Sequence, residues 1–213
     1  MNTTTNANLF SRLFDGLDDP NRLAIEQLDG SRITYGDLIA RAGQMANVLV
    51  ERGVKPGDRV AVTVPGYPPY RHILTALGCE PVLIETSGDT RHALTGEALL
   101  AAHRKAPLKG VLVGSPANPT GTMMSREALS NLMAAADSAG IRFISDEIYH
   151  GLDYAFPAVT AAELSPNALV INSFSKYFCM TGWRVGWLIV PKWLRAPLDR
   201  LEANLTVCPP AIS

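Results

Sequence analysis

The chain of 213 residues is long enough for one good-sized domain or two small ones, and its 47% hydrophobic and 18% charged residues are those of an ordinary globular protein. Its formal net charge of -1 gives no electrostatic reason to expect nucleic acid or an anionic membrane as a partner. No apolar run approaches the roughly 20 residues of a transmembrane helix, and residues 1–8 do not resemble a signal peptide. The cysteines and histidines lack metal-ligand spacing. We therefore expect a reduced cytoplasmic protein without a metal site.

The first 64 residues predict mixed secondary structure. Apolar residues within residues 9–14 have the spacing of a short amphipathic helix. Asp29-Gly30 lies between two short segments that predict strands, and this dipeptide is a strong turn signal there, so residues 24–34 predict a β-hairpin. Thr34 and Asp37 have the pattern of a capping box at the start of a further helix. Residues 59–64 then predict a strand.

From residue 67 onward, predicted helices and strands alternate. Helices are expected at residues 70–77, 95–103 and about 125–140, and strands at residues 81–86, 110–114, 141–145, 168–171 and 185–190. This alternation indicates an α/β fold with a mostly parallel sheet flanked by helices. Ligands bind beyond the carboxyl ends of the strands in such sheets. Asn118, Asp146 and Ser173 each follow a predicted strand and should therefore gather along one edge.

Residues 173–184 carry the strongest chemical signal. They read Ser-Phe-Ser-Lys-Tyr-Phe-Cys-Met-Thr-Gly-Trp-Arg, with Lys176 close to two serine hydroxyls and eight residues before Arg184. A lysine amine can condense with an aldehyde when desolvation or a nearby charge lowers its pKa, and arginine binds phosphate in a bidentate manner. Pyridoxal phosphate carries both groups on one ring. The alternative is that Lys176 and Arg184 only solvate a loop.

Three further motifs accompany this stretch. Pro-Gly-Tyr-Pro-Pro-Tyr occupies residues 65–70, Ser-Pro-Ala-Asn-Pro-Thr-Gly occupies residues 115–121, and Asp-Glu-Ile-Tyr occupies residues 146–149. In this order and spacing, together with residues 173–184, they resemble the large domain of the class I and II aminotransferases, which are pyridoxal phosphate enzymes of fold type I. The resemblance covers residues 65–213 and implies an incomplete large domain of that fold.

The resemblance implies catalytic roles for Lys176, Asp146 and Tyr149, and a cofactor contact for Asn118. Lys176 would form a Schiff base with pyridoxal phosphate and move a proton at the substrate α-carbon. Asp146 would pair with the pyridinium nitrogen and keep it protonated, whereas a helix N-cap followed by Glu147 is the structural alternative. Tyr149 and Asn118 would hydrogen-bond the ring hydroxyl, although Asn118 also belongs to a plain turn.

The remaining cofactor contacts follow from the same family pattern. Ser173, Ser175 and Arg184 would hold the phosphate group, because hydroxyls and a guanidinium suit a charged acceptor. Tyr67 would lie against the face of the pyridine ring. The alternative for Tyr67 is a tyrosine that packs on its own proline-rich turn.

Residues 1–64 resemble a different family. Ile-Thr-Tyr-Gly-Asp-Leu at residues 33–38 and Gly-Val-Lys-Pro-Gly-Asp-Arg-Val-Ala-Val at residues 53–62 are similar to the N-terminus of acyl-CoA synthetases of the malonyl-CoA type. The Ser/Thr/Gly-rich nucleotide loop of those ligases has no counterpart here, so no ligase site residue can be assigned. The chain therefore divides into residues 1–64 and residues 65–213 and looks like a hybrid of two families.

The larger resemblance implies transfer of an amino group between an amino acid and a 2-oxo acid, with pyridoxal phosphate as cofactor and a homodimer as assembly. Two departures from the family predict weak cofactor binding and slow turnover or none. No small glycine-containing loop precedes residue 65, and the chain ends before the small domain that carries the substrate-carboxylate arginine. The alternative functions are an acyl-CoA ligase-like fragment and a non-catalytic hybrid without cofactor.

Overall fold

A computed structural model of the chain describes residues 17–26, 30, 32–37 and 55–205. The helix predicted within residues 9–14 and the body of the helix predicted after Thr34 lie outside these described residues. The predicted strand at residues 59–64 and every element predicted after it lie inside them.

The described N-terminal residues form a β-hairpin. β1 (Leu23–Glu26) pairs antiparallel with β2 (Arg32–Thr34), and Gly30 adopts the left-handed φ of 83° that a tight turn favours. Asp37 Oδ2 accepts the Thr34 N–H at 2.8 Å, and Thr34 Oγ1 accepts the Asp37 N–H at 3.1 Å. This reciprocal pair is a capping box. The predicted hairpin and the predicted cap are both confirmed.

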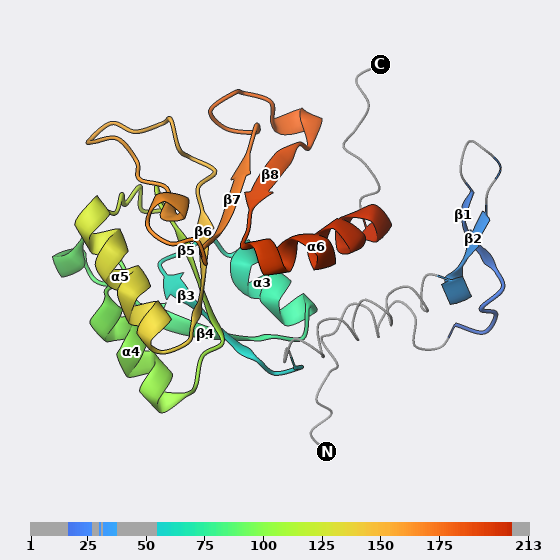
Figure 1. Cartoon of the computed structure of the whole chain (residues 1–213), viewed down its shortest axis with the longest axis horizontal. Coiled ribbons are helices and arrows are strands. Elements are labelled where there is room, and N and C mark those ends of the chain that lie inside the picture. Colours follow the sequence, from blue (N-terminus) through green and yellow to red (C-terminus); the bar gives the residue numbers. More distant parts are fainter. Residues whose placement is uncertain (1–16, 27–29, 31, 38–54, 206–213) are drawn as a thin grey trace.

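A six-stranded sheet forms the centre of the molecule (Figure 1). Its strands are β3 (Arg59–Val64), β4 (Glu80–Glu85), β5 (Gly110–Gly114), β6 (Arg142–Asp146), β7 (Leu169–Ser173) and β8 (Gly186–Ile189). Across the sheet they lie in the order β4-β3-β5-β6-β7-β8, and all neighbouring pairs are parallel except β7 with β8. The predicted mostly parallel α/β sheet is confirmed.

Helices and short turns connect the strands, and a last helix follows β8. They are α3 (Pro69–Ala76), α4 (Gly96–Lys105), α5 (Arg126–Ser138) and α6 (Lys192–Leu205), with the 3-10 turns η1 (Gly88–Thr90), η2 (Ala161–Glu163) and η3 (Thr181–Trp183). The Thr95 and Ser125 hydroxyls accept backbone N–H groups in the first turns of α4 and α5, so both helices begin with a side-chain cap. Gly140, at a φ of 65°, follows α5 and ends it, as predicted.

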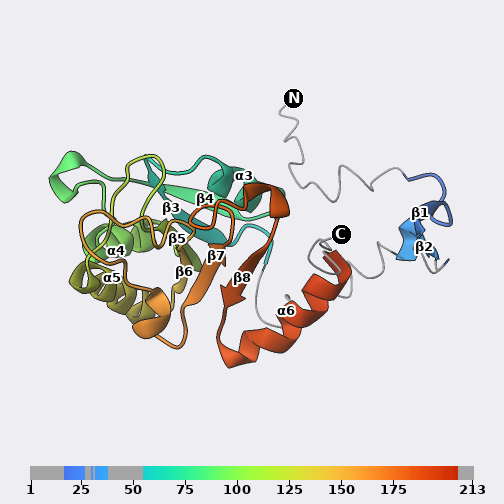
Figure 2. The same cartoon turned by 90° about the horizontal axis from the view of Figure 1, so that it is seen from above.

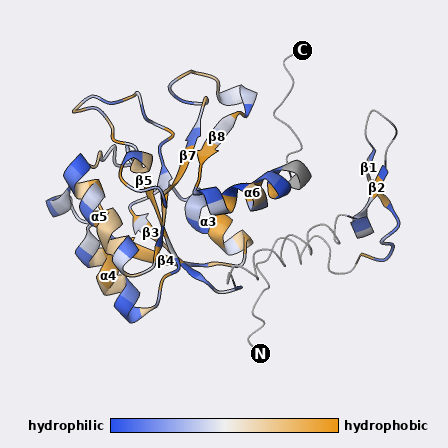
Figure 3. Ribbon diagram, viewed as in Figure 1, coloured by the Kyte–Doolittle hydropathy of each residue, from blue (hydrophilic) through white to orange (hydrophobic). Residues whose placement is uncertain are grey.

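The helices cover both faces of the sheet, and this gives three layers (Figure 2). Successive side chains of a strand point to opposite faces. Val60 and Val62 of β3 pack with Leu74 of α3 on one face, whereas Ala61 packs on the other face in the larger core that includes Leu132 of α5. Figure 3 shows hydrophobic stretches of ribbon in the strands of the sheet and within α4 and α5. The sheet is therefore a rigid base for the loops at its edge.

The predicted boundary at residue 64 falls at the end of β3, which lies in the sheet between β4 and β5. This boundary stays a prediction. No helix among the described residues is long and apolar enough to span a bilayer. Within the same part of the chain, no three His, Cys, Asp or Glu side chains are grouped as a metal site would require.

Candidate active site

The carboxyl ends of three parallel strands lie side by side at one edge of the sheet. Gly114 of β5 pairs with Asp146 of β6, which pairs with Ile171 of β7. The loops that follow β6 and β7 leave the sheet at the same end (Figure 1). The prediction that Asn118, Asp146 and Ser173 follow strands that end at one edge agrees with this register.

Asp146 is the last residue of β6 and is half-buried. Its Oδ1 accepts the Ile148 N–H at 3.1 Å, and its Oδ2 accepts the Tyr70 hydroxyl at 2.5 Å. Turns rather than a helix follow it, so the alternative of a helix N-cap with Glu147 in the first turn is wrong. A carboxylate has about four lone-pair sites. Asp146 therefore keeps acceptor capacity for a further N–H donor.

Tyr67 and Tyr70 bring two aromatic rings to the same site. Their ring centroids lie 5.4 Å apart with an interplanar angle of 81°, which is an edge-to-face arrangement. Tyr67 is exposed, at 42% of its full surface, and can offer its ring to a ligand. Burial, together with the nearby Asp146 carboxylate, raises the pKa of Tyr70 far above its usual value. Tyr70 is therefore a neutral hydrogen-bond donor.

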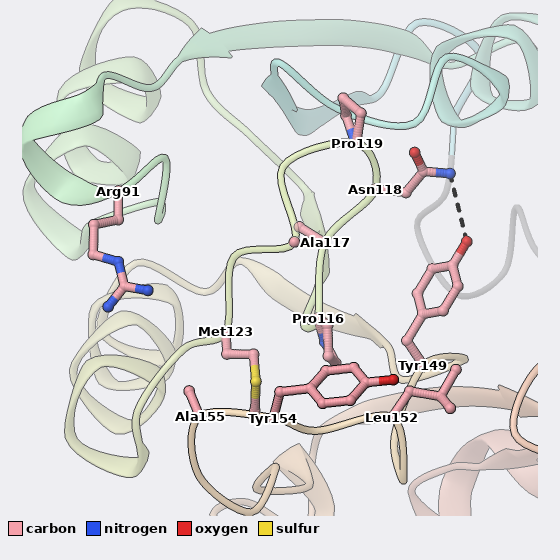
Figure 4. A pocket seen from close by; sticks show the side chains of 11 residues that line it. Arg91, Pro116, Ala117, Asn118, Pro119, Met123, Tyr149, Leu152, Tyr154 and Ala155 are labelled. Atoms are coloured by element: carbon pink, nitrogen blue, oxygen red, sulfur yellow. Dashed lines mark hydrogen bonds between the residues drawn. The ribbon is translucent and has the colours of Figure 1, made fainter.

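Asn118 and Tyr149 meet across two loops. The Asn118 amide Nδ2 lies 3.5 Å from the Tyr149 hydroxyl, at the long limit for a hydrogen bond (Figure 4). The turn that carries Asn118 is closed by the Gly121 N–H, which donates to the Ala117 carbonyl at 2.7 Å. A pocket of about 450 Å³ lies against this pair and is lined by Arg91, Pro116, Ala117, Asn118, Pro119, Gly121, Met123, Tyr149, Leu152, Tyr154 and Ala155. An amide and a phenol thus converge beside an open space.

Lys176 lies in the loop between β7 and β8 and is half-buried. Its Nζ lies 6.0 Å from the centroid of the Tyr149 ring, at the outer limit of a cation–π contact. Within the described part of the chain, this ammonium takes part in no ion pair and no side-chain hydrogen bond. It is therefore a lysine that the fold leaves available for chemistry, next to the Asn118–Tyr149 pair.

Ser173 and Ser175 form a small hydroxyl cluster three residues and one residue before Lys176. Their Oγ atoms lie 2.5 Å apart, and the Ser175 N–H donates to Ser173 Oγ at 3.0 Å. Ser173 Oγ also donates to the Val185 carbonyl at 3.0 Å. Thr181 fixes the same loop, because its hydroxyl donates to the Ser175 carbonyl at 2.6 Å. The fold therefore brings the two predicted phosphate-binding hydroxyls together.

Arg184 is exposed and has a left-handed φ of 53°. Its Nη1 donates to the Thr181 carbonyl at 3.0 Å. A guanidinium offers about five N–H donors, so most of them remain for an anion. No contact places Arg184 against the Ser173 and Ser175 hydroxyls, and its phosphate-binding role stays a prediction.

A family model for the aminotransferases of class I and II matches residues 40–212. The chain belongs to this family. A valine–pyruvate aminotransferase of Mycobacterium tuberculosis is 52% identical over 159 residues, which cover 74% of this chain and 40% of that relative. A putative aminotransferase of Bacillus subtilis is 30% identical over 215 residues, which cover 99% of this chain and 54% of that relative.

Solved structures of aminotransferases share the fold of this chain. One from Mycobacterium tuberculosis matches with a TM-score of 0.69 and 47% identity, over 80% of this chain and 46% of that chain. One of a putative aminotransferase from Silicibacter pomeroyi matches with a TM-score of 0.69 and 41% identity, over 95% of this chain and 50% of that chain. The chain thus spans about half the length of the relatives that it matches. The predicted fold, part of a fold type I large domain, is confirmed.

The family match begins at residue 40, inside the segment whose sequence resembles acyl-CoA synthetases. The motif at residues 53–62 therefore lies within the aminotransferase match. The ligase resemblance and the hybrid origin that it implies stay predictions.

Pyridoxal phosphate is the cofactor of this family, and the polar groups at the strand edge fit it. Asp146 keeps lone pairs for a pyridinium N–H, and Arg184 keeps most of its donors for a phosphate. Lys176 Nζ makes no ion pair among the described residues, so it is not committed to another side chain there. The side chains at this edge therefore suit pyridoxal phosphate, the cofactor expected from the sequence.

Two polar residues at this edge have contacts that the motifs do not predict. Tyr70 reaches Asp146, and Glu147 is buried, with Oε1 accepting the Ser145 hydroxyl at 3.0 Å and the Ala161 N–H at 2.8 Å. The spacing of Tyr67 and Tyr70, three residues apart beside a helix, is the signal that could have paired the two rings. The local sequence does not predict that Glu147 is buried.

Proposed function

We propose that the chain is the cofactor-binding part of a pyridoxal phosphate-dependent aminotransferase, which moves an amino group from an amino acid to a 2-oxo acid. The observation that carries this proposal is the position of Lys176 Nζ over the Tyr149 ring, beside the hydroxyl that Asn118 contacts. Three motifs far apart in the sequence meet there, and each supplies a group that the chemistry needs.

When bound, pyridoxal phosphate supplies a conjugated pyridinium ring that takes up the electrons released at the substrate α-carbon. Lys176 would hold the cofactor through Nζ and, once released, carry the proton that leaves the α-carbon. Asp146 would accept the pyridinium N–H through its free lone pairs. Asn118 and Tyr149 would hold the ring hydroxyl oxygen, because their polar ends already converge.

The remaining contacts would fix the cofactor in place. Ser173 and Ser175 would turn their clustered hydroxyls to the phosphate, and Arg184 would neutralise it with its free N–H groups. Tyr67 would lie against the ring, since its exposed side chain is already set at a right angle to Tyr70.

We propose valine and pyruvate as the substrates. The support is the relative from Mycobacterium tuberculosis that bears these names and is 52% identical over 74% of this chain. Apart from Arg91, Asn118 and two tyrosines, the side chains that line the pocket beside Asn118 and Tyr149 are apolar, and these suit a branched aliphatic group.

The assembly and the division of the chain are part of the same proposal. We infer a homodimer from the family resemblance. Residues 1–64 would supply scaffold, including β3, whereas residues 65–213 would hold the cofactor.

The test is an assay for 2-oxo acid formation from single amino acids, with pyridoxal phosphate, pyruvate and the full chain, read by mass spectrometry. We expect 2-oxo acid from valine in excess over that from aspartate, and none with Lys176→Ala. Equal yields from the wild-type chain and from Lys176→Ala would refute the function. Preference for aspartate would refute the substrate alone.

A further inference from the structure

Tyr70 joins three elements at the candidate active site. It lies in the first turn of α3, and its hydroxyl donates a hydrogen bond of 2.5 Å to Asp146 Oδ2 at the end of β6. The two residues are 76 positions apart, so the fold brings them together. The end of β5 lies alongside, because Gly114 pairs with Asp146.

The direction of this hydrogen bond follows from the surroundings of Tyr70. Burial raises the pKa of Tyr70, and the Asp146 carboxylate raises it further. The phenol therefore stays protonated, and it donates while the carboxylate accepts. A hydrogen bond from a hydroxyl to an ionised carboxylate belongs to the strong, short class.

Gly114 gives the Tyr70 hydroxyl the room that this contact needs. A Cβ at position 114 would lie 3.3 Å from Tyr70 Oη, which is tighter than an ordinary contact. The hydroxyl would have to move by a few tenths of an ångström, away from its present place beside Asp146. Position 114 therefore offers a way to disturb this hydrogen bond without removing a polar group.

Asp146 is held from two sides. The Ile148 N–H, from the turn that Asp146 itself opens, donates to Oδ1 at 3.1 Å. The Tyr70 hydroxyl, from a helix on one face of the sheet, donates to Oδ2. Two donors on different oxygens restrain rotation of the carboxylate about both the Cα–Cβ and the Cβ–Cγ bonds, whereas a single donor on Oδ1 leaves much of this rotation free.

We propose that Tyr70 is a positioning residue that orients the Asp146 carboxylate toward the ring nitrogen of pyridoxal phosphate. The inference rests on the proposed function, because that function makes Asp146 the partner of this nitrogen. Without the Tyr70 hydroxyl, only the Ile148 N–H holds Asp146 among the described residues, and the Asp146 side chain gains access to as many as about three staggered positions about χ1. Cofactor affinity falls in proportion to the fraction of time spent in the competent position, which gives a loss of about threefold.

The test compares two ligands by titration of the full chain: pyridoxal phosphate, and its analogue in which the ring nitrogen is replaced by C–H. The analogue keeps the aldehyde and the phosphate but offers nothing to Asp146. Tyr70→Phe keeps the ring beside Tyr67 and removes only the hydroxyl. We expect it to raise the Kd of pyridoxal phosphate about threefold and to leave the Kd of the analogue unchanged.

A second pair of variants repeats the test without touching Tyr70. Gly114→Ala should weaken pyridoxal phosphate selectively, in the same way as Tyr70→Phe. Gly88→Ala, at a glycine whose added Cβ would meet nothing within 4 Å, should weaken neither ligand. Thermal melts of all variants establish that each is folded before titration.

The possible outcomes distinguish the positioning role of Tyr70 from the proposed function on which it rests. Equal weakening of both ligands by Tyr70→Phe would overturn the inference, because a purely structural role acts on both. Unchanged affinity for pyridoxal phosphate would overturn it as well. A wild-type chain that binds neither ligand would refute the proposed function, and the inference with it.

Discussion

Glu147 is a buried carboxylate that holds the loop after β6, next to the candidate active site. Its Oε1 accepts the Ser145 hydroxyl and the Ala161 N–H, and His150 Nδ1 lies 3.4 Å from its Oε2. A carboxylate buried to 2% exposure is tolerated only when such donors surround it. Its contacts tie the loop that carries Tyr149 to η2, so we assign Glu147 a structural role.

Replacement of Glu147 should therefore reduce stability. Glu147→Ala leaves the Ser145 hydroxyl and the Ala161 N–H buried without an acceptor, and it should lower the free energy of unfolding by about 1–3 kcal/mol. Glu85→Ala, at an exposed carboxylate at the end of β4, should change it by no more than about 0.5 kcal/mol. Urea unfolding measures both. Equal effects of the two variants would show that the buried contacts contribute nothing.

Which contacts of single residues can be predicted from the sequence depends on how far apart the two residues lie along the chain. The sequence could place Asn118, Asp146 and Ser173 at one edge of the sheet, because each lies at or just after the end of a strand and neighbouring parallel strands end together. The contact between Tyr70 and Asp146 could not, since 76 residues separate them and helix packing decides it. The local sequence is compatible with Glu147 in the first turn of a helix, whereas in the structure Glu147 is buried in a loop.

At the scale of elements, strands and caps carry the clearest signals. The predicted strands at residues 59–64 and 110–114 have the same bounds as β3 and β5, because short apolar runs between turn residues are typical of buried strands. α6 could not be predicted, since Pro197 lies inside it and proline normally ends a helix. The antiparallel direction of β8 is set by its pairing with β7, which no local pattern encodes.

The helix α5 offers a test of the larger core. Leu132 is fully buried between α5 and the sheet, whereas Leu77, just after α3, is 72% exposed. Leu132→Ala should lower the free energy of unfolding by about 2–5 kcal/mol, through lost burial and the cavity that remains. Leu77→Ala deletes the same atoms from a side chain that is exposed to solvent, so it should lower the free energy of unfolding by less than about 0.5 kcal/mol. Chemical unfolding measures both variants, and an equal loss of unfolding free energy in the two would contradict the three-layer core.

At the scale of the whole molecule, one mostly parallel sheet explains how distant motifs form a site. The strands β5, β6 and β7 end side by side, and the loops after them bring Asn118, Asp146 and Lys176 to one edge. The rest of the sheet and α4 and α5 supply the rigid base. The family match over residues 40–212 and the shared fold of solved aminotransferases agree with this arrangement. The central claim is that Lys176 is the residue that holds pyridoxal phosphate.

The most direct measurement of this claim is covalent trapping. The full chain is incubated with pyridoxal phosphate, reduced with borohydride and digested, and mass spectrometry locates the cofactor mass. We predict that this mass lies on the peptide that contains Lys176, because this ammonium lies beside Tyr149 without a charged partner in the described part of the chain. Lys176→Arg, which keeps the charge, should remove it. A label spread over Lys105, Lys109 and Lys192 in both proteins would contradict the account.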